Sequence, residues 1–339
     1  MQLVNQQWIY QRAPTDVVGP EHYRLQKTLL TPELAHDEVL IAARYISVDP
    51  YMRINQAMQD TWSAPHALNC VQGGAVVAEV LASNASEYAP GDWVVSYSGW
   101  QTHAKMHASA LSKINIKLAP ASAYLGVLGM PGRTAWFGLT EAGQPRAGEV
   151  VVVSGAAGAV GSLVVQFAQM QGAKVLALAG SAEKCRWLTQ SLGATWGLNY
   201  KDYESSNHLS QALKSLVGGV DVYFDNVGGM VSDAVFPIIN RRARIVICGQ
   251  ISQYSTGLDQ PELGARFLHH ILYQRARIQG ILARDYTARA DEMLRIVAPM
   301  VQSGALQFEQ TVLEGFTRLP EALNQLFTGN QRGKLMVKV

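Results

Sequence analysis

The sequence predicts an α/β fold in which a β-rich domain is followed by a doubly wound parallel sheet. Short β-rich runs separated by turn residues occupy the first third of the chain, and strands and helices alternate from about residue 125. A glycine-rich turn joins a strand to a helix at residues 150–161. Alternating strands and helices are typical of a parallel sheet with helices on its faces. The 339 residues leave room for about two domains.

The β-rich part is indicated by runs at residues 38–43, 74–81 and 93–97, with Pro90-Gly91-Asp92 as a turn. Such runs predict a mostly antiparallel, partly closed sheet. An alternating strand at residues 334–339 is expected to return to this first domain.

The alternating part begins near residue 125 and follows a strand–helix order. The predicted strands are residues 150–153, 175–179, 221–224, 244–248 and 277–282, and the predicted helices include residues 160–171 and 183–192. We therefore expect a first domain at residues 1–124, a second at residues 125–303, and a return to the first over residues 304–339.

Composition and charge exclude several classes of protein. The chain has 28 Lys and Arg against 26 Asp and Glu, a net charge of +2, and no long run of either sign. This balance argues against binding to nucleic acid or to a membrane surface. Residues 150–173 lack any charged side chain, but their glycine spacing predicts a strand, a turn and a helix instead of a membrane span. Three scattered cysteines and no secretory signal predict a cytoplasmic protein.

The glycine-rich turn predicts a dinucleotide site. Gly158 would let the backbone approach a pyrophosphate, and Gly161 would let the following helix pack close to the strand. Ala156 stands where the full fingerprint has its first glycine. Tight packing of a helix on a strand would produce the same spacing, but the strand before and the helix after favour binding.

The end of the second strand indicates which dinucleotide binds. An NAD site usually has Asp or Glu there, whereas this chain has Gly180-Ser181 and then Lys184 and Arg186. Glu183 stands beside Lys184, but one position along the helix it is expected to point away. Cations at this place can neutralise a 2′-phosphate, so NADP(H) is favoured over NAD. The alternative is that both cations are solvated residues on the first turns of a helix.

No residue pattern predicts a metal site. None of the cysteines has a close cysteine partner, and His103 and His107 are expected in a strand and turn where they would not converge. His269 and His270 are adjacent and are expected to diverge on a helix.

Hydrolase chemistry is not indicated either, because Ser154 and Ser252 lack a nucleophile-elbow pattern. The basic cluster of Arg241, Arg242 and Arg244 is expected to lie in a solvated loop. Tyr51 and Tyr254 remain as polar candidates for chemistry.

Six motifs then occur in a fixed order along nearly the whole chain. They are Val48-Asp49-Pro50-Tyr51-Met52-Arg53, Gly99-Trp100-Gln101, residues 125–132, Glu183-Lys184-Cys185-Arg186, residues 224–229 and residues 248–254. Together they resemble the zinc-free medium-chain dehydrogenase/reductase superfamily, in its prostaglandin reductase and curcumin reductase branch. The resemblance implies a GroES-like domain, a Rossmann domain and a homodimer to which residues 265–274 contribute.

The resemblance also implies an NADPH-dependent reductase of conjugated carbon–carbon double bonds in enones and enals. Gly158, Ala159, Val160 and Gly161 would line the pyrophosphate, Lys184 would meet the 2′-phosphate, and Tyr200 would contact the adenosine half. The ribose and nicotinamide would be flanked by Asn226, Cys248, Ser252, Tyr254, Ile281 and the rest of residues 248–254 and 281–283.

The chain departs from this family at two places. Gln331, with Asn330 beside it, stands where the family usually has Asn before the final Gly-Lys, and we expect Gln331 to contact the cofactor. The proline-rich loop that normally follows Tyr254 is shortened to residues 255–261. That loop borders the substrate in relatives, so the substrate preference is expected to differ.

The expected chemistry needs a donor to the carbonyl oxygen of the substrate. Hydride addition to the β-carbon of an enone places negative charge on that oxygen, and Tyr51 and Tyr254 are neutral phenol donors. Alternatively, Tyr51 packs beside Pro50, Tyr254 only contacts the cofactor, and the ribose hydroxyl of the cofactor donates. The rival functions are an NADPH-dependent quinone reductase and a non-catalytic NADPH-binding regulatory protein.

Overall fold

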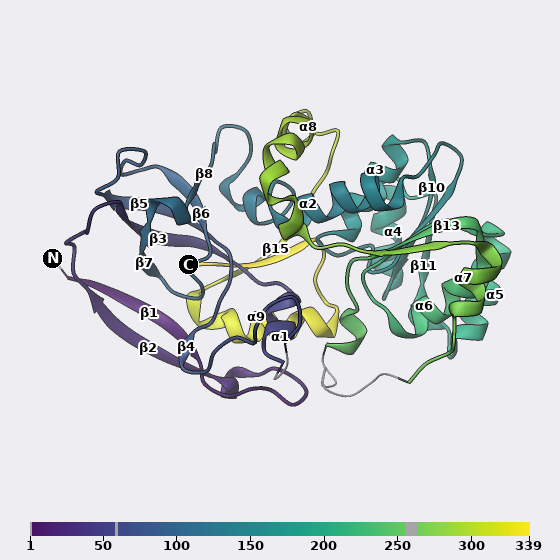
Figure 1. Cartoon of the computed structure of the whole chain (residues 1–339), viewed down its shortest axis with the longest axis horizontal. Coiled ribbons are helices and arrows are strands. Elements are labelled where there is room, and N and C mark those ends of the chain that lie inside the picture. Colours follow the sequence, from purple (N-terminus) through teal and green to yellow (C-terminus); the bar gives the residue numbers. More distant parts are fainter. Residues whose placement is uncertain (1, 58–59, 255–262) are drawn as a thin grey trace. The chain divides into compact units, whose positions relative to one another are not determined.

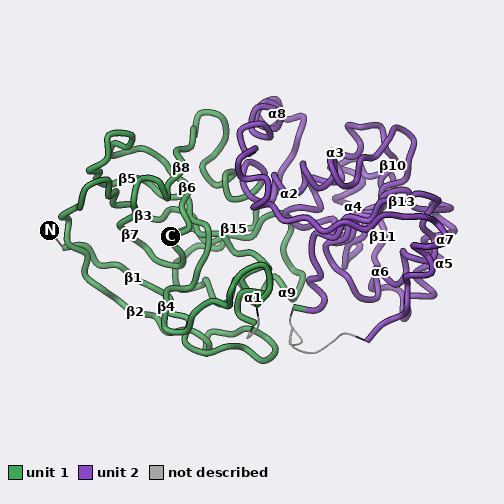
Figure 2. Tube along the Cα trace, in the orientation of Figure 1, with its two compact units in different colours: residues 1–126, 254–260, 310–339 green, residues 127–253, 261–309 purple. Residues whose placement is uncertain are grey.

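The computed structural model describes residues 2–57, 60–254 and 263–339. Apart from the undescribed residues, a first compact unit takes in residues 1–126, 254–260 and 310–339, and a second takes in residues 127–253 and 261–309 (Figure 2). The α/β fold class predicted from the sequence is confirmed. The expected domain limits at residues 124/125 and 303/304 stay predictions.

The first unit is built on two mainly antiparallel sheets (Figure 1). In its described residues, the larger sheet has the order β15-β16-β3-β5-β6-β8, with β7 also pairing with β3. Its strands are β3 (Glu38–Ser47), β5 (Val76–Ser83), β6 (Trp93–Ser96), β7 (His103–His107), β8 (Ser112–Lys113), β15 (Gln310–Glu314) and β16 (Lys334–Lys338). The smaller sheet contains β1 (Leu3–Tyr10), β2 (Tyr23–Leu30) and β4 (Cys70–Val71).

The long strand β3 organises this unit because it has β5, β7 and β16 as antiparallel partners. The last strand of the chain, β16, pairs with it through Met336 opposite Ser47. The helices are α1 (Tyr51–Asn55), which directly follows β3, and α9 (Leu319–Thr328). The core of the unit includes side chains of β3, of α1 and of α9, with the fully buried Trp100 among them.

The second unit is a parallel sheet with the order β11-β10-β9-β12-β13-β14. Its described strands are β9 (Val150–Val153), β10 (Lys174–Ala179), β11 (Trp196–Asn199), β12 (Val220–Asp225), β13 (Ile239–Ile247) and β14 (Arg277–Gly280). The described helices are α2 (Met130–Phe137), α3 (Gly161–Met170), α4 (Ala182–Gln190), α5 (Ser206–Val217), α6 (Gly229–Val235), α7 (Leu268–Gln274) and α8 (Ala290–Gln302).

Strand β9 lies between β10 and β12, which explains why it consists of four valines. A strand buried on both faces has no reason to alternate apolar and polar residues. Side chains of α5 and α6 pack against Val152 on one face of this sheet, and α3 follows β9 on the other (Figure 1). Within the described residues, no helix combines the length and the apolar character needed to cross a membrane.

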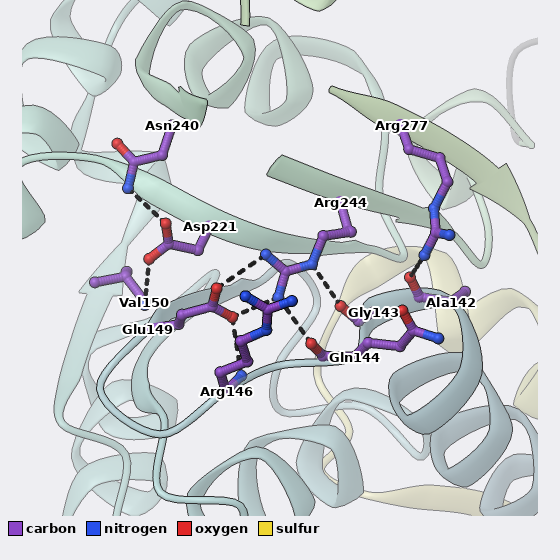
Figure 3. A network of polar contacts seen from close by, with 10 residues as sticks. All are labelled: Ala142, Gly143, Gln144, Arg146, Glu149, Val150, Asp221, Asn240, Arg244 and Arg277. Atoms are coloured by element: carbon purple, nitrogen blue, oxygen red, sulfur yellow. Dashed lines mark hydrogen bonds and ion pairs between the residues drawn. The ribbon is translucent and has the colours of Figure 1, made fainter. Parts of the chain in front are cut away.

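A network of polar contacts joins the sheet to the segment that follows α2 (Figure 3). The guanidinium of Arg244 pairs with Glu149 and donates to the carbonyl oxygens of Gly143 and Gln144, at 2.9 and 2.8 Å. Arg277 donates to the carbonyl oxygen of Ala142 at 2.8 Å. These acceptors are at the end of the π-helical segment Gly138–Gly143, where a helix presents unpaired carbonyls to cations.

The expectation that Arg241, Arg242 and Arg244 lie in a solvated loop is therefore wrong, because all three are within β13. Arg244 is within β13, and its side chain is 16% exposed. Burial alone would raise the pKa of Glu149, but the hydrogen bonds and charge of Arg244 outweigh burial and lower it. Beside this pair, the Asp221 carboxylate accepts from the Val150 N–H and from the Asn240 amide, both at 2.8 Å (Figure 3).

We expect Arg244→Ala to lower the thermal midpoint by several degrees, because it leaves Glu149 and the carbonyl oxygens of Gly143 and Gln144 short of a donor. This corresponds to about 2 kcal/mol of unfolding free energy. The matched control is Arg241→Ala, at an exposed position on the same strand, which should change stability by less than about 0.5 kcal/mol. Differential scanning calorimetry would measure both variants. Equal midpoints for the two would contradict this account of the network.

Candidate cofactor and active site

The glycine turn after β9 leaves no space for larger residues. A Cβ atom on Gly161 would lie 2.4 Å from the carbonyl oxygen of Gly155, and one on Gly158 would lie 3.2 Å from it. Gly155 itself has a φ of +56°, in the left-handed region that glycine tolerates. The turn therefore brings Gly158, Ala159 and Val160, all half-buried, to the N-terminus of the ten-residue helix α3. The N–H groups of a helix N-terminus suit a pyrophosphate.

Asp225 ties this turn to the next strand. Its carboxylate is 1% exposed, and its Oδ1 accepts from the hydroxyls of Ser154 and Tyr223, both at 2.9 Å. The same oxygen accepts from the N–H groups of Val227 and Gly228, and Oδ2 accepts from the Ser232 hydroxyl at 2.5 Å. One buried carboxylate thus fixes residues from three separate segments. Asp225 lies inside the motif at residues 224–229, but the sequence pattern alone indicates no role for it.

Asn226 is held against the glycine turn by the neighbouring contacts. Its backbone N–H donates to the Ser154 hydroxyl at 2.9 Å, and its amide donates to the Ser154 carbonyl at 2.7 Å. The Ser252 hydroxyl donates to the Val227 carbonyl at 2.6 Å. Asn226 and Ser252 therefore lie close together, as the predicted cofactor site requires.

Cys248 and Ile281 follow the neighbouring strands β13 and β14. The Cys248 N–H donates to the carbonyl oxygen of Asp225 at 2.8 Å, and the Ile281 N–H donates to Ile247 at 3.1 Å. Burial and the charge of Asp225 raise the pKa of the Cys248 thiol to about 12, so it stays protonated at neutral pH. A ligand of a parallel sheet binds at the carboxyl ends of the strands, where these residues lie.

The adenosine end of the predicted site is formed by the segments after β10 and β11. Gly180 and Ser181 follow β10 without an acidic residue, and the Ser181 hydroxyl caps α4 by accepting from the Lys184 N–H at 3.3 Å. Tyr200 follows β11, and its hydroxyl would lie 3.5 Å from a Cβ on Gly180. The structure thus brings Lys184 and Tyr200 to adjacent segments at one edge of the sheet.

The first unit carries Tyr51 at the start of α1, beside a buried ion pair. Lys334 Nζ lies 3.2 Å from Asp49 Oδ1 and donates to the carbonyl oxygens of Val48 and Leu335, both at 2.7 Å. The side chains of Lys334 and Asp49 are 3% and 5% exposed. Burial, and then the charge of Asp49, raise the pKa of Tyr51 well above its ordinary value, which keeps the phenol protonated.

Gln331 and Tyr254 are also in the first unit. The Gln331 amide donates to the Leu326 carbonyl at 3.2 Å, and its Oε1 is buried without a hydrogen-bond partner among the described residues. Such an oxygen can accept a hydrogen bond from a bound group. Tyr254 is half-buried after the helical turn Ile251–Gln253. The shortened loop at residues 255–261 lies outside the described residues.

Two histidine side chains on α7, His269 and His270, lie closer together than the sequence predicts. The rings of His269 and His270, on α7, lie 3.9 Å apart between centroids, so the expectation that they diverge is wrong. Both are in the first turn of an outward-facing helix, where the rings can tilt toward each other. Across the ranges that the structure describes, no group of three or more His, Cys, Asp or Glu residues could hold a metal ion.

Asp225→Asn tests whether the buried carboxylate shapes the dinucleotide site. The amide replaces one acceptor oxygen by an NH₂ group, which cannot accept from the donors that now surround it. We expect a lower thermal midpoint and an at least tenfold weaker Kd for NADPH, measured by fluorescence titration. Ser232→Ala removes one of the five donors and should have a smaller effect on both. A wild-type Kd in Asp225→Asn would contradict this role.

Comparison with known proteins identifies the family. Residues 6–114 match the N-terminal domain of oxidoreductases, and residues 159–299 match the zinc-binding dehydrogenase domain. The putative NADP-dependent oxidoreductase YfmJ of Bacillus subtilis is 44% identical over 97% of this chain and 96% of its own length. The 2-alkenal reductase of Nicotiana tabacum is 38% identical over 92% and 90%.

A solved structure agrees with these matches. The crystal structure of CurA from Vibrio vulnificus in complex with NADPH has a TM-score of 0.90 and 34% identity, covering 98% of this chain and 99% of CurA. The resemblance drawn from the sequence motifs is confirmed. The chain belongs to the medium-chain dehydrogenase/reductase superfamily, in its zinc-free branch with the curcumin and prostaglandin reductases.

Proposed function

We propose that this protein reduces the α,β-double bond of conjugated ketones and aldehydes with NADPH. The use of NADPH is supported most strongly by the residues at the end of β10. Strand β10 ends without an acidic residue and is followed by Lys184, at the same sheet edge as the glycine turn. A carboxylate there would repel a 2′-phosphate, and a lysine attracts it. Relatives named for 2-alkenals, curcumin and prostaglandins support reduction of a conjugated double bond.

The residues present fit NADP(H). The backbone at Gly158, Ala159, Val160 and Gly161 would hold the pyrophosphate, and the close packing of Gly161 on the Gly155 carbonyl sets the start of α3 at this turn. The groups proposed around the remaining parts of the cofactor are Lys184, Tyr200, Asn226, Cys248, Ser252, Tyr254, Ile281 and Gln331. Gln331 contributes a buried oxygen that has no partner within the described part of the chain. When bound, NADPH supplies the hydride that adds to the β-carbon of the substrate.

Tyr51 is proposed as the donor to the substrate's carbonyl oxygen. Negative charge develops on that oxygen as the hydride adds, and a neutral phenol can donate to it. The buried pair of Asp49 and Lys334 fixes the residues directly before Tyr51. Tyr254 is proposed as a second donor. There are three alternatives to donation by these tyrosines. Tyr51 packs beside Pro50, Tyr254 only contacts the cofactor, or the cofactor's ribose hydroxyl is the donor.

The function is tested by following NADPH oxidation with a panel of enones, enals and quinones, with NADH in parallel. We expect turnover of enones or enals to saturated products and a strong preference for NADPH. Turnover of quinones alone would identify the rival quinone reductase. Binding of NADPH without turnover of any of these compounds would favour the non-catalytic regulatory protein.

Tyr51→Phe should lower kcat for an enone by about tenfold to a hundredfold, because it removes one donor to the developing oxyanion. Its Kd for NADPH should stay unchanged. Since burial raises the pKa of Tyr51 well above that of an ordinary tyrosine, the donor stays protonated, and its contribution should persist through the pH range in which an ordinary tyrosine loses its proton. Tyr88→Phe is the control, because the Tyr88 hydroxyl donates to the Leu111 carbonyl in the first unit and has no proposed role in the site. A wild-type kcat in Tyr51→Phe would contradict this role of Tyr51 and would leave Tyr254 or the cofactor's ribose hydroxyl as the donor.

We also propose a homodimer formed through the edge of the parallel sheet. Strand β14 is the last in the strand order, and nothing in the described residues pairs with its outer side. The neighbouring helix α7 exposes Leu268, Leu272 and Tyr273, at 69%, 71% and 68%. An unpaired edge and a nearby exposed apolar patch favour pairing with a second copy around a two-fold axis. A cytoplasmic location, expected from the three free cysteines, completes the proposal.

Leu272→Glu should convert the dimer to a monomer, because it places a charge in the exposed apolar patch of α7. Analytical ultracentrifugation would measure the mass. Leu216→Glu, at a partly exposed position on α5, is the matched control and should stay dimeric. A monomeric wild-type protein, or a dimeric Leu272→Glu variant, would contradict this interface.

A further inference from the structure

We propose that Lys201 is a second cation for the 2′-phosphate of NADP(H) and that it contributes to the preference for NADPH over NADH. None of the sequence motifs singles out this residue. The inference rests on the proposed cofactor site and adds to it a residue that discriminates between the two dinucleotides.

Lys201 reaches the site because β10 and β11 are parallel neighbours. Ala179 pairs with Asn199, so the residues that follow the two strands emerge side by side. A Cβ on Gly180 would lie 3.1 Å from Lys201 Cε, the carbon that carries the ammonium group. The Lys201 side chain therefore crosses the end of β10. In a dinucleotide-binding sheet, the adenosine ribose lies at this strand end.

The ammonium group of Lys201 is available to a ligand. The residue is exposed, and its side chain makes no hydrogen bond or ion pair with any residue that the structure describes. The adjacent Asp202 carboxylate accepts from the Asn199 amide at 2.5 Å. Lys201 thus holds an unneutralised positive charge beside Gly180, the residue that stands where an NAD site usually has an acid.

The chemistry of the ligand explains why two lysines are useful. A phosphate monoester carries a charge of about −1.5 to −2 at neutral pH, more than Lys184 alone can neutralise. The ribose of NADH has a neutral hydroxyl at the same place and gains little from either cation. Lys201 should therefore strengthen the binding of the phosphorylated dinucleotide selectively, instead of strengthening the binding of both.

Lys201→Gln keeps most of the side chain and removes its charge. The experiment measures Kd by isothermal titration for NADPH and NADH, and for the fragments adenosine 2′,5′-bisphosphate and AMP. We expect about fivefold weaker binding of the two ligands with a 2′-phosphate, the effect of losing about 1 kcal/mol from an exposed charge pair. NADH and AMP should bind as they do to the wild-type protein.

Two further variants show whether the loss of affinity is specific to cations near the 2′-phosphate. Lys184→Gln should produce the same selective loss, and Lys214→Gln, on α5, should change none of the four Kd values. Equal weakening of phosphorylated and unphosphorylated ligands by Lys201→Gln, or no weakening, would overturn the assignment of Lys201. A wild-type protein that bound NADH as tightly as NADPH would instead overturn the proposed cofactor preference.

Discussion

The carboxylate of Asp225 is the contact on which the candidate cofactor site depends. It is buried at the carboxyl end of β12, and none of the described cations pairs with it. Five hydrogen bonds stabilise its charge, from three hydroxyls and two backbone N–H groups. A buried charge without these donors would be strongly destabilising. The donors must therefore stay in place, and they belong to the glycine turn, to β12 itself through Tyr223, to the loop after β12 and to α6.

The contacts at the amino ends of the parallel strands and those at their carboxyl ends have different roles. At the amino ends, Arg244 and Arg277 donate to the end of the π-helical segment, and Asp221 joins the starts of β9 and β12. These contacts stabilise the unit. At the carboxyl ends of the strands, the contacts of Asp225 and Ser154 position Asn226 beside the glycine turn. In the first unit, the buried pair of Lys334 and Asp49 fixes the residues before Tyr51, just as Asp225 fixes the residues around Asn226 in the second unit.

Much of the fold could be predicted because the signals are local. The valine run of β9 and the glycine spacing before α3 are contiguous in the sequence, and the predicted limits of both lie within one residue of the observed ones. Strand β11 was not predicted, because its four residues are all half-buried and show no clear period. The role of Arg244 was also missed, since its acceptors are about 100 residues away in the chain.

The same limit applies to the candidate site. Lys184 could be found because it follows a recognisable strand end, but Lys201 reaches that place only through the pairing of β10 with β11. The hydrogen bonds of Asp225 likewise join residues up to 71 positions apart. Pairing between distant segments is set by the fold as a whole, so a motif can name such a residue without revealing what it contacts.

The most direct test of the proposed chemistry follows the hydrogen atom that is transferred. NADPH labelled with deuterium at the transferable C4 position would be incubated with the protein and a simple linear enone, and the product examined by NMR. We expect a saturated ketone with one deuterium on the former β-carbon. Deuterium on the carbonyl carbon of an allylic alcohol, or no saturated ketone at all, would contradict it.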